Sequence, residues 1–271
     1  MAEGQARFTR VSAAPEIDVS VPHSARFWNY LVGGKDHFES DRRAAAEVCA
    51  ALPVLADLAR DGRGFLIRAV RFLAGEGKVR QFLDIGTGVP TANNTHEVAQ
   101  SVAPDSRIVY VDNDPIVLVH ARSLLTSSPE GLTDYIDADV NDPAAILREA
   151  GKTLSYSEPV ALMLIGIINF VLDDARARQI VAELMAALPS GSYLTVQHPA
   201  SEDPGMVECI RRWNTHGKDK LVARSHEEVT RYFDGLRLLE PGVVTLNQWR
   251  PDDPSTAGRY VPSYAAVGYK P

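Results

Sequence analysis

The chain has 271 residues, 45% of them apolar and 23% charged, and its 28 Lys and Arg against 35 Asp and Glu give a formal net charge of −7. This apolar content excludes disorder over most of the chain, because burying it offsets the entropy lost on ordering. The longest apolar run, residues 162–172, is shorter than the roughly 20 residues of a membrane-spanning helix. The acidic balance, with no block rich in Lys or Arg, disfavours nucleic-acid binding.

The N-terminus and the cysteines indicate the compartment. Residues 1–5 lack the basic and apolar segments of a secretory signal. Cys49 and Cys209 lie far apart, with no second thiol or histidine at ligand spacing, so free thiols fit better than a zinc site. We expect a cytoplasmic protein without a metal and without membrane attachment.

The first part of the chain predicts helices. Residues 1–22 are small, polar and aperiodic, which indicates a loose N-terminal segment. A helix then begins at Ser24 and ends at Gly33-Gly34, where glycine provides a stop, and a second helix covers Ser40–Leu52. Four apolar residues at helical spacing mark the buried face of a third helix: Leu66, Ala69, Val70 and Leu73. We expect a helical cap over residues 23–76.

From residue 77 to residue 271 strands alternate with helices. The predicted strands are Val79–Ile85, Arg107–Asp112, Thr133–Asp137, Val160–Ile165 and Gly191–Gln197. The predicted helices between them are Thr91–Val102, Pro115–Leu125, one opened by Asp142-Pro143, and Asp173–Leu188. This alternation predicts an α/β fold with a parallel, doubly wound sheet. Beyond Pro204 two helical stretches and short strands near 236–239 and 264–268 would complete the sheet with an antiparallel edge.

A glycine turn follows the first strand. The order strand, Gly86-Thr87-Gly88, helix brings backbone N–H groups to a ligand at a helix N-terminus. A dinucleotide turn needs a third glycine, and Thr91 stands there after Pro90, which disfavours a nicotinamide oxidoreductase. Asp112 ends the second strand, where a carboxylate accepts both ribose hydroxyls, while Asp114 fills the helix-cap role. The pattern favours adenosine with a small amino-acid tail, as in S-adenosyl-L-methionine; an ordinary tight turn is the alternative.

Loop residues after the second and third strands extend this candidate site. Asn113 directly follows Asp112, the carboxylate expected to bind the ribose. Asp139 follows the third strand, in a position to accept from the adenine amino group, with Val140 against the ring. The alternative for Asp139 is a loop carboxylate next to the N-cap Asp142.

Several segments together resemble known methyltransferases. Phe82–Gly88 is similar to motif I of class I S-adenosylmethionine-dependent methyltransferases. Ala25–Asp36, Val109–Pro115 and Gly191–Leu194 resemble a bacterial S-adenosyl methyltransferase family formerly catalogued as a domain of unknown function. The resemblance extends from Ala25 to the C-terminus. It implies a Rossmann-like class I fold with a seven-stranded, mostly parallel sheet and an antiparallel edge strand, a helical N-terminal cap, and S-adenosyl-L-methionine as cofactor. One departure is Asn169, where the family usually has histidine.

Further candidates come from the cap and from later strand ends. Four cap residues suit a lid over the amino-acid tail of the methyl donor, the alternative being a solvated helix start: Arg26, Tyr30, Gly33 and Lys35. Gly166 follows the fourth strand, beside the expected methyl group. His198 ends the fifth strand and is the best candidate base, with a structural histidine as the alternative.

These observations predict an S-adenosylmethionine-dependent methyltransferase that acts on a small molecule by in-line displacement, with no nucleic-acid partner. The loop after the fourth strand lacks the Asn/Asp-Pro-Pro-Tyr sequence of transferases that modify nucleobase amino groups, and no Pro-Cys nucleophile is present. Alignment and desolvation supply much of the catalysis in such a displacement. The alternative is a catalytically silent module that binds the donor or another adenosine ligand. The acceptor and the oligomeric state stay open.

Overall fold

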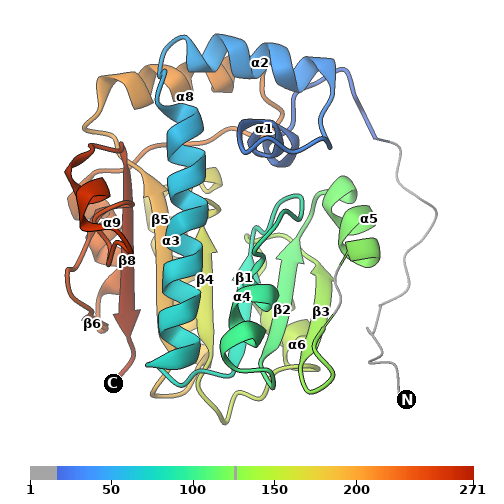
Figure 1. Cartoon of the computed structure of the whole chain (residues 1–271), viewed down its shortest axis with the longest axis vertical. Coiled ribbons are helices and arrows are strands. Elements are labelled where there is room, and N and C mark those ends of the chain that lie inside the picture. Colours follow the sequence, from blue (N-terminus) through green and yellow to red (C-terminus); the bar gives the residue numbers. More distant parts are fainter. Residues whose placement is uncertain (1–16, 125–126) are drawn as a thin grey trace.

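A computed structural model describes residues 17–124 and 127–271. It shows one central sheet with helices on both faces (Figure 1). The strands follow the order β3-β2-β1-β4-β5-β8-β6, and β7 pairs with β8 beside this path. Their bounds are β1 (Gln81–Ile85), β2 (Arg107–Asp112), β3 (Leu132–Asp137), β4 (Ala161–Ile165), β5 (Tyr193–Pro199), β6 (Arg237–Leu238), β7 (Val244–Thr245) and β8 (Ser263–Tyr269).

The pairing confirms the expected class I methyltransferase sheet. Strands β1 to β5 pair in parallel, and β8 runs antiparallel to β5, β6 and β7. The two-residue strand β7 adds an eighth strand to the seven that were expected. The central strand β4 reads Ala-Leu-Met-Leu-Ile and has its first four residues fully buried, as a strand covered on both faces requires.

The helices are α1 (Ser24–Leu31), α2 (Glu39–Cys49), α3 (Leu55–Gly75), α4 (Thr95–Val102), α5 (Pro115–Leu124), α6 (Pro143–Ala150), α7 (Asp174–Ala187), α8 (Pro204–His216) and α9 (His226–Thr230), with short 3₁₀ turns η1 (Ile168–Phe170), η2 (Arg231–Phe233) and η3 (Pro254–Gly258). In these described residues no helix is long and apolar enough to cross a membrane.

Two predicted helix boundaries need comment. The helix after the glycine turn begins at Thr95, not at the predicted Thr91. Asn93 has a φ of +61°, which an α-helix does not allow, and the Glu97 carboxylate accepts from the Asn94 N–H at 2.7 Å, so the helix starts there. The predicted end of the next helix, Leu125, lies outside the described residues.

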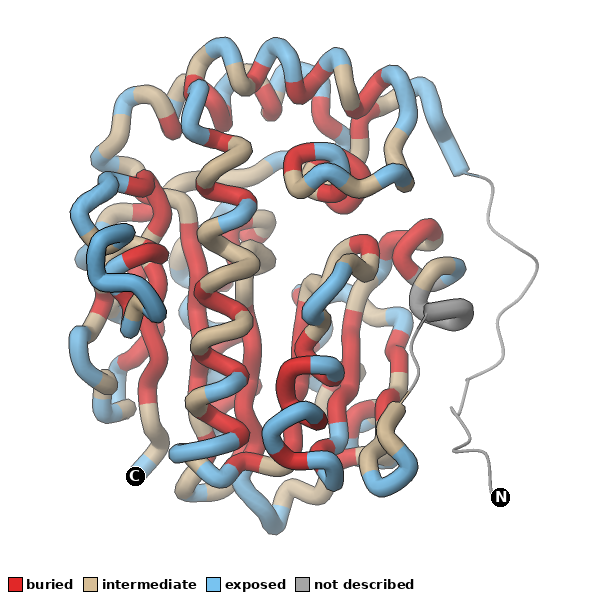
Figure 2. Tube along the Cα trace, viewed as in Figure 1, coloured by how far each residue is buried: buried red, intermediate tan, exposed pale blue. Residues whose placement is uncertain are grey.

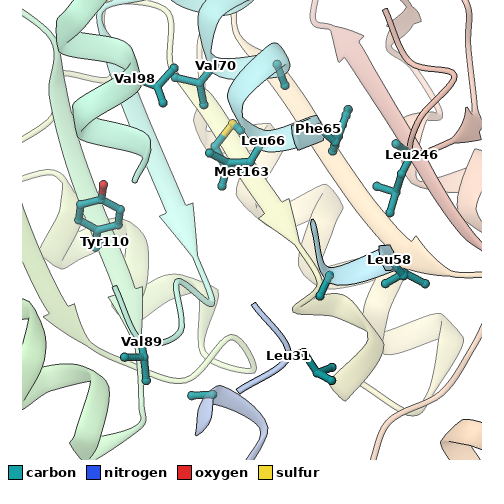
Figure 3. Close-up of a cluster of buried hydrophobic side chains, with 14 of the residues drawn as sticks. Leu31, Leu58, Phe65, Leu66, Val70, Val89, Val98, Tyr110, Met163 and Leu246 are labelled. Carbon is teal, nitrogen blue, oxygen red and sulfur yellow. The ribbon is translucent and has the colours of Figure 1, made fainter. Parts of the chain in front are cut away.

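Apolar side chains of the sheet alternate between two buried clusters. Phe82 and Ile108 join the cluster under α3 and α4, whereas Leu83 and Val109 join the cluster under α6 and α7, because successive strand residues point to opposite faces. Figure 2 shows the strands as the most continuously buried part of the trace. Figure 3 shows part of the first cluster, with side chains of α3 around Met163 of β4.

Helices α1, α2 and α8 lie over the carboxyl ends of the parallel strands (Figure 1). An ion pair joins α1 to α2: Arg26 Nε lies 3.0 Å from Asp41 Oδ2, and both side chains are buried. The first buried cluster contains residues of these helices together with residues of β1 and β4, so the predicted cap and the sheet share one core. The division at residues 76 and 77 stays a prediction.

Candidate functional site

Two cavities lie at the carboxyl edge of the sheet, under the helical cover. The first, here called the carboxylate cavity, has a volume of about 440 Å³ and is lined by the ends of β1, β2 and β3. The second, the apolar cavity, has a volume of about 210 Å³ and lies between α1, α3, α8 and the ends of β4 and β5. Four residues line both cavities, which therefore adjoin: Ser24, Ala25, Trp28 and Gly88.

The glycine turn forms the wall between the cavities. Gly86 has a φ of +79° and Gly88 a φ of +63°, in the left-handed region that favours glycine. A Cβ at Gly86 would lie 2.6 Å from the Cβ of Ile167, whereas a Cβ at Gly88 would meet nothing within 4 Å. Gly86 is thus required by packing, and Gly88 leaves backbone open to a ligand.

Asp112 lines the carboxylate cavity, where sequence reasoning expected it. Its Oδ2 accepts from the Gly88 N–H at 2.8 Å and its Oδ1 from the Asp114 N–H at 3.0 Å. Each carboxylate oxygen has two lone pairs, so each retains one acceptor position. Burial raises the pKa of Asp112 above its usual range. Asp114 also accepts from the Ile116 N–H at 2.9 Å, as the predicted cap of α5.

The loop after β3 completes this cavity. Asp139, Val140 and Asn113 all line it. Asp139 Oδ1 accepts from the N–H and the side-chain amide of Asn141, at 2.8 and 2.9 Å. The helix-cap role belongs instead to Asp142, which accepts from the Ala145 N–H.

The cap contributes residues that the sequence did not single out. His23 joins three segments, since its Nδ1 lies 2.8 Å from Asp114 Oδ2 and its Nε2 lies 3.3 Å from Asp219 Oδ2. Burial acts to raise the pKa of Asp114, but the hydrogen bond and charge of His23 outweigh it and lower this pKa. Lys218, Asp219 and Lys220, beyond α8, close the same cavity.

The cap residues that were predicted to bind the donor lie elsewhere. Arg26 is 2% exposed, and its guanidinium is occupied by Asp41 and by the carbonyls of Asp18 and Val21. The Tyr30 ring packs edge-on against His37 at 4.9 Å. None of the four, Arg26, Tyr30, Gly33 and Lys35, is in the lining of either cavity, and their contact with the donor stays a prediction.

The apolar cavity has one charged end. Asp84, at the end of β1, accepts from Thr95 Oγ1 at 2.6 Å, and its burial raises its pKa to about 6. Arg63 of α3 faces the same space, donating to the carbonyls of Ala92 and Asn93 at 3.0 and 2.8 Å. Burial lowers the pKa of Arg63, and the nearby Asp84 carboxylate opposes that shift. The carboxylate of Asp84 on β1 and the guanidinium of Arg63 on α3 thus belong to the lining of the same cavity.

His198 does not lie in the apolar cavity, although the sequence suggested it as a base. It is fully buried, with Nδ1 3.0 Å from the Pro199 carbonyl and Nε2 3.0 Å from Arg224 Nη1. Because guanidinium only donates, Nε2 is the acceptor and Nδ1 carries the proton. Burial lowers the pKa of His198 to about 3. A neutral histidine whose two nitrogens are occupied fits the structural alternative that the sequence left open.

His198 instead supports the segment after β4. Arg224 donates to the carbonyls of Ile168 and Val171 at 3.3 and 2.7 Å and pairs with Asp174 at 3.1 Å. This arrangement fixes η1, which lies between the two cavities. The sequence alone could not predict the contact between His198 and Arg224, because helix α8 lies between the two residues in the chain.

Two amide side chains, of Asn169 and Gln197, line the apolar cavity from the segments that follow β4 and end β5, and the predicted Gly166 and Thr87 line it as well. Gln197 donates to Ser263 Oγ at 2.7 Å. Asn169 is 5% exposed, and its Oδ1 has no hydrogen-bond partner within the described part of the chain.

Comparisons place this geometry in a family. Residues 10–271 match the model of the S-adenosyl methyltransferase family. The chain is similar to a DUF574 family protein from Streptomyces avermitilis, with 45% identity, a TM-score of 0.90 and coverage of 94% of this chain and 100% of that one. A protein from Thermobifida fusca is 41% identical, with a TM-score of 0.87 and coverage of 93% and 96%.

A more distant structure shares the fold. The magnesium protoporphyrin IX methyltransferase of Synechocystis, crystallised with bound SAH, is 9% identical, with a TM-score of 0.52 and coverage of 90% of this chain and 93% of that one. Among curated proteins no sequence matches this chain. The match over nearly the whole length and the two close structures show that the chain belongs to the S-adenosyl methyltransferase family.

Proposed function

We propose that this protein transfers the methyl group of S-adenosyl-L-methionine to a small molecule, with the donor's adenosine in the carboxylate cavity and the acceptor in the apolar cavity. The observation that carries the proposal is the shared wall. Gly88 and the α1 residues Ser24, Ala25 and Trp28 line both cavities, so molecules in the two spaces meet at one place, as a direct transfer requires.

The residues of the carboxylate cavity fit an adenosine. Asp112 retains one acceptor position on each oxygen, which matches the two hydroxyls of a ribose. Asp139 offers a carboxylate oxygen for the adenine amino group, and Val140 is a buried apolar neighbour for the ring. The open space at the Gly88 Cβ position admits a ligand against the backbone.

The charged end of the apolar cavity fits the amino-acid tail. An α-amino acid carries an ammonium and a carboxylate, and Asp84 and Arg63 present the complementary charges. We assign the tail to this pair instead of to Tyr30 and Lys35, which line neither cavity.

The protein's part in the reaction is alignment and exclusion of water. When bound, S-adenosyl-L-methionine supplies a methyl group on a sulfonium, which is already activated for displacement. Trp28 and Phe27 of α1 and Trp213 of α8 cover the apolar cavity, which keeps water from the meeting point and strengthens the electrostatics there. The wall at Gly88 sets the approach of one molecule to the other.

Calorimetry with S-adenosyl-L-methionine and S-adenosyl-L-homocysteine tests the proposal. Both should bind, and Asp112→Asn should weaken both by at least about tenfold, because charge-assisted hydrogen bonds are lost. The matched control is Asp137→Asn, since Asp137 pairs with Asp112 across β2 and β3 but is exposed and lines neither cavity. Thermal unfolding verifies that both variants are folded.

Failure of both compounds to bind the wild-type protein contradicts the proposal. Binding without transfer to any member of a metabolite library would instead identify the silent binding module that the sequence left as the alternative.

A further inference from the structure

His23 joins two segments of the cover at the edge of the carboxylate cavity. Its side chain is 14% exposed, with Nδ1 2.8 Å from Asp114 Oδ2 and Nε2 3.3 Å from Asp219 Oδ2. His23 lines this cavity together with Lys218, Asp219 and Lys220, here called the 218–220 segment. One imidazole ring thus links the start of α1, the start of α5 and the segment that follows α8, beside the proposed donor site.

The 218–220 segment is also attached through its backbone. The Lys218 N–H donates to the Pro22 carbonyl at 3.1 Å, and the Asp219 carbonyl accepts from Trp213 Nε1 at 2.7 Å. Neither of these hydrogen bonds involves a group that changes its charge near neutral pH. The side-chain contact between His23 and Asp219 is therefore the part of the attachment that depends on charge.

The charge of the His23 ring decides whether both carboxylates can stay in contact with it. A neutral imidazole has one N–H and one lone pair, whereas a protonated imidazole has an N–H at each nitrogen. An ionised carboxylate only accepts, so the lone pair of a neutral ring would face one of the two carboxylates and repel it. The arrangement with Asp114 and Asp219 at the two nitrogens therefore fits the protonated ring.

Burial decides which contact is lost when the ring gives up its proton. The side chain of Asp114 is 5% exposed, whereas that of Asp219 is 40% exposed. An unpaired carboxylate is costly where it is buried and much less costly where water can solvate it. The remaining N–H therefore stays with Asp114, and Asp219 turns to water.

The other charged groups around His23 in the described residues come from α1, α2 and the 218–220 segment. The Asp41 carboxylate accepts from the His23 backbone N–H at 3.0 Å and lies 3.0 Å from Arg26 Nε. Lys220 Nζ donates to two backbone carbonyls at the end of α8, at 2.7 and 3.0 Å, and Lys218 is exposed. These groups keep their partners or their water when the ring changes charge, so the contact with Asp219 is the one that changes.

We propose that His23 is a positioning residue that, when protonated, holds the 218–220 segment over the donor in the carboxylate cavity. This inference rests on the proposed function, which assigns the donor's adenosine to that cavity. When His23 loses its proton, Asp219 is released, the segment moves away more readily and the donor leaves faster. Histidine is the side chain whose charge changes between pH 5 and 8, so closure should weaken as pH rises through that range.

The dissociation rate of S-adenosyl-L-homocysteine tests the inference, measured by surface plasmon resonance on the immobilised full chain at pH 5.5 and pH 8.5. In the wild type the rate should be about fivefold higher at pH 8.5, for the loss of one partly exposed ion pair. Asp219→Asn should remove this difference, because an amide can donate to a ring lone pair as well as accept from a ring N–H. His23→Gln should remove it too. Any pH dependence that Asp84 adds is common to all the proteins and cancels when their rate ratios are compared.

The matched control is His216→Gln, which should keep the wild-type rate ratio. His216 is an exposed histidine at the end of α8, its Nε2 lies 3.7 Å from Glu47 Oε2, and it is in neither lining. Thermal unfolding at both pH values verifies that each variant is folded, and if His23→Gln is not, Asp219→Asn decides alone.

Two failures are distinguishable. A wild-type rate ratio no larger than that of Asp219→Asn overturns the inference and leaves the proposed function standing. Failure of the wild type to bind S-adenosyl-L-homocysteine at either pH removes the proposed function itself.

Discussion

The carboxylate cavity and the apolar cavity share a wall but are built differently. The carboxylate cavity is made largely from the ends of three neighbouring strands and the loops after them, and these ends supply the carboxylates of Asp112 and Asp139. The apolar cavity is made from side chains of α1, α2, α3 and α8, which are distant in sequence. The first depends on strand order and the second on helix packing.

This difference separates the two binding tasks. Strand ends in a parallel sheet are rigid and adjacent, which suits the donor that we propose for the carboxylate cavity. Helices that cover the sheet can change their side chains without changing the sheet, which suits the acceptor that we propose for the apolar cavity. The segment of η1 and the preceding Ile167 lies between the cavities: Ile167 and Phe170 line the carboxylate cavity, and Asn169 lines the apolar cavity.

The largest expected effect concerns that shared segment. Arg224→Met removes a buried guanidinium that pairs with Asp174 and holds two carbonyls, so the free energy of unfolding should fall by about 4 kcal/mol. Hydrogen exchange of residues 166–172 should accelerate in the same variant. Arg178→Met, which removes an exposed partner of the same Asp174, should cost less than about 1 kcal/mol. Equal losses in the two variants would refute the role given to Arg224.

The second prediction concerns the charged end of the apolar cavity. Burial raises the pKa of Asp84 to about 6 in the folded protein, above its unfolded value, so its contribution to stability is complete at low pH and is lost as pH rises through 6. Without donor, Asp84→Asn should therefore be more stable than the wild type at pH 7.5, by about 3 kcal/mol at most, and should bind the donor more weakly.

Denaturant unfolding at pH 4.5, 6 and 7.5 measures this difference. Asp105→Asn, at an exposed carboxylate that pairs with Arg80, should follow the wild type at every pH. An Asp84→Asn protein that is less stable than the wild type at pH 7.5 would show that the carboxylate is stabilised in the donor-free cavity.

The third prediction concerns the histidine beneath the same cavity. Burial lowers the pKa of His198 to about 3, so its contribution to stability is complete above the unfolded pKa of about 6.5 and is lost as pH falls through 3. Between pH 7.5 and pH 5 this residue alone should cost the wild type about 2 kcal/mol. In His198→Gln, whose amide oxygen can still accept from Arg224, that part of the decline should disappear. An unchanged decline would mean that folding does not lower the pKa of His198.

The smallest expected effect on stability lies in the carboxylate cavity. Gly88→Ala imposes a left-handed backbone on a residue with a side chain, at a cost of about 1 kcal/mol, and its methyl group enters space assigned to the donor. Gly235→Ala carries the same cost, since its φ is +78° with nothing near the Cβ position, but it lies in neither lining. Donor affinity should fall in Gly88→Ala only. A parallel fall in both would trace the loss to stability.

What the sequence by itself determined follows from local rules. The alternation of strands and helices led to the sheet, and the glycine turn with Asp112 led to the carboxylate cavity, because adjacent parallel strands bring their carboxyl ends together. The predicted Gly86, Asn113, Asp139 and Val140 also line that cavity. Each of these residues lies within a few positions of a strand end, where position along the chain specifies position in space.

The tertiary structure alone decided the cap and the chemistry at the strand ends. His23 lies in the lining of the carboxylate cavity because its ring contacts Asp114 and Asp219, which come from two distant segments of the chain. The Arg26 side chain pairs with Asp41 instead. His198 is buried against Arg224 and Asn169 is left with an unpaired oxygen. A residue type and its place on a strand do not specify which distant groups pack against it, and those groups decide whether it acts as a base, a support or a binding group.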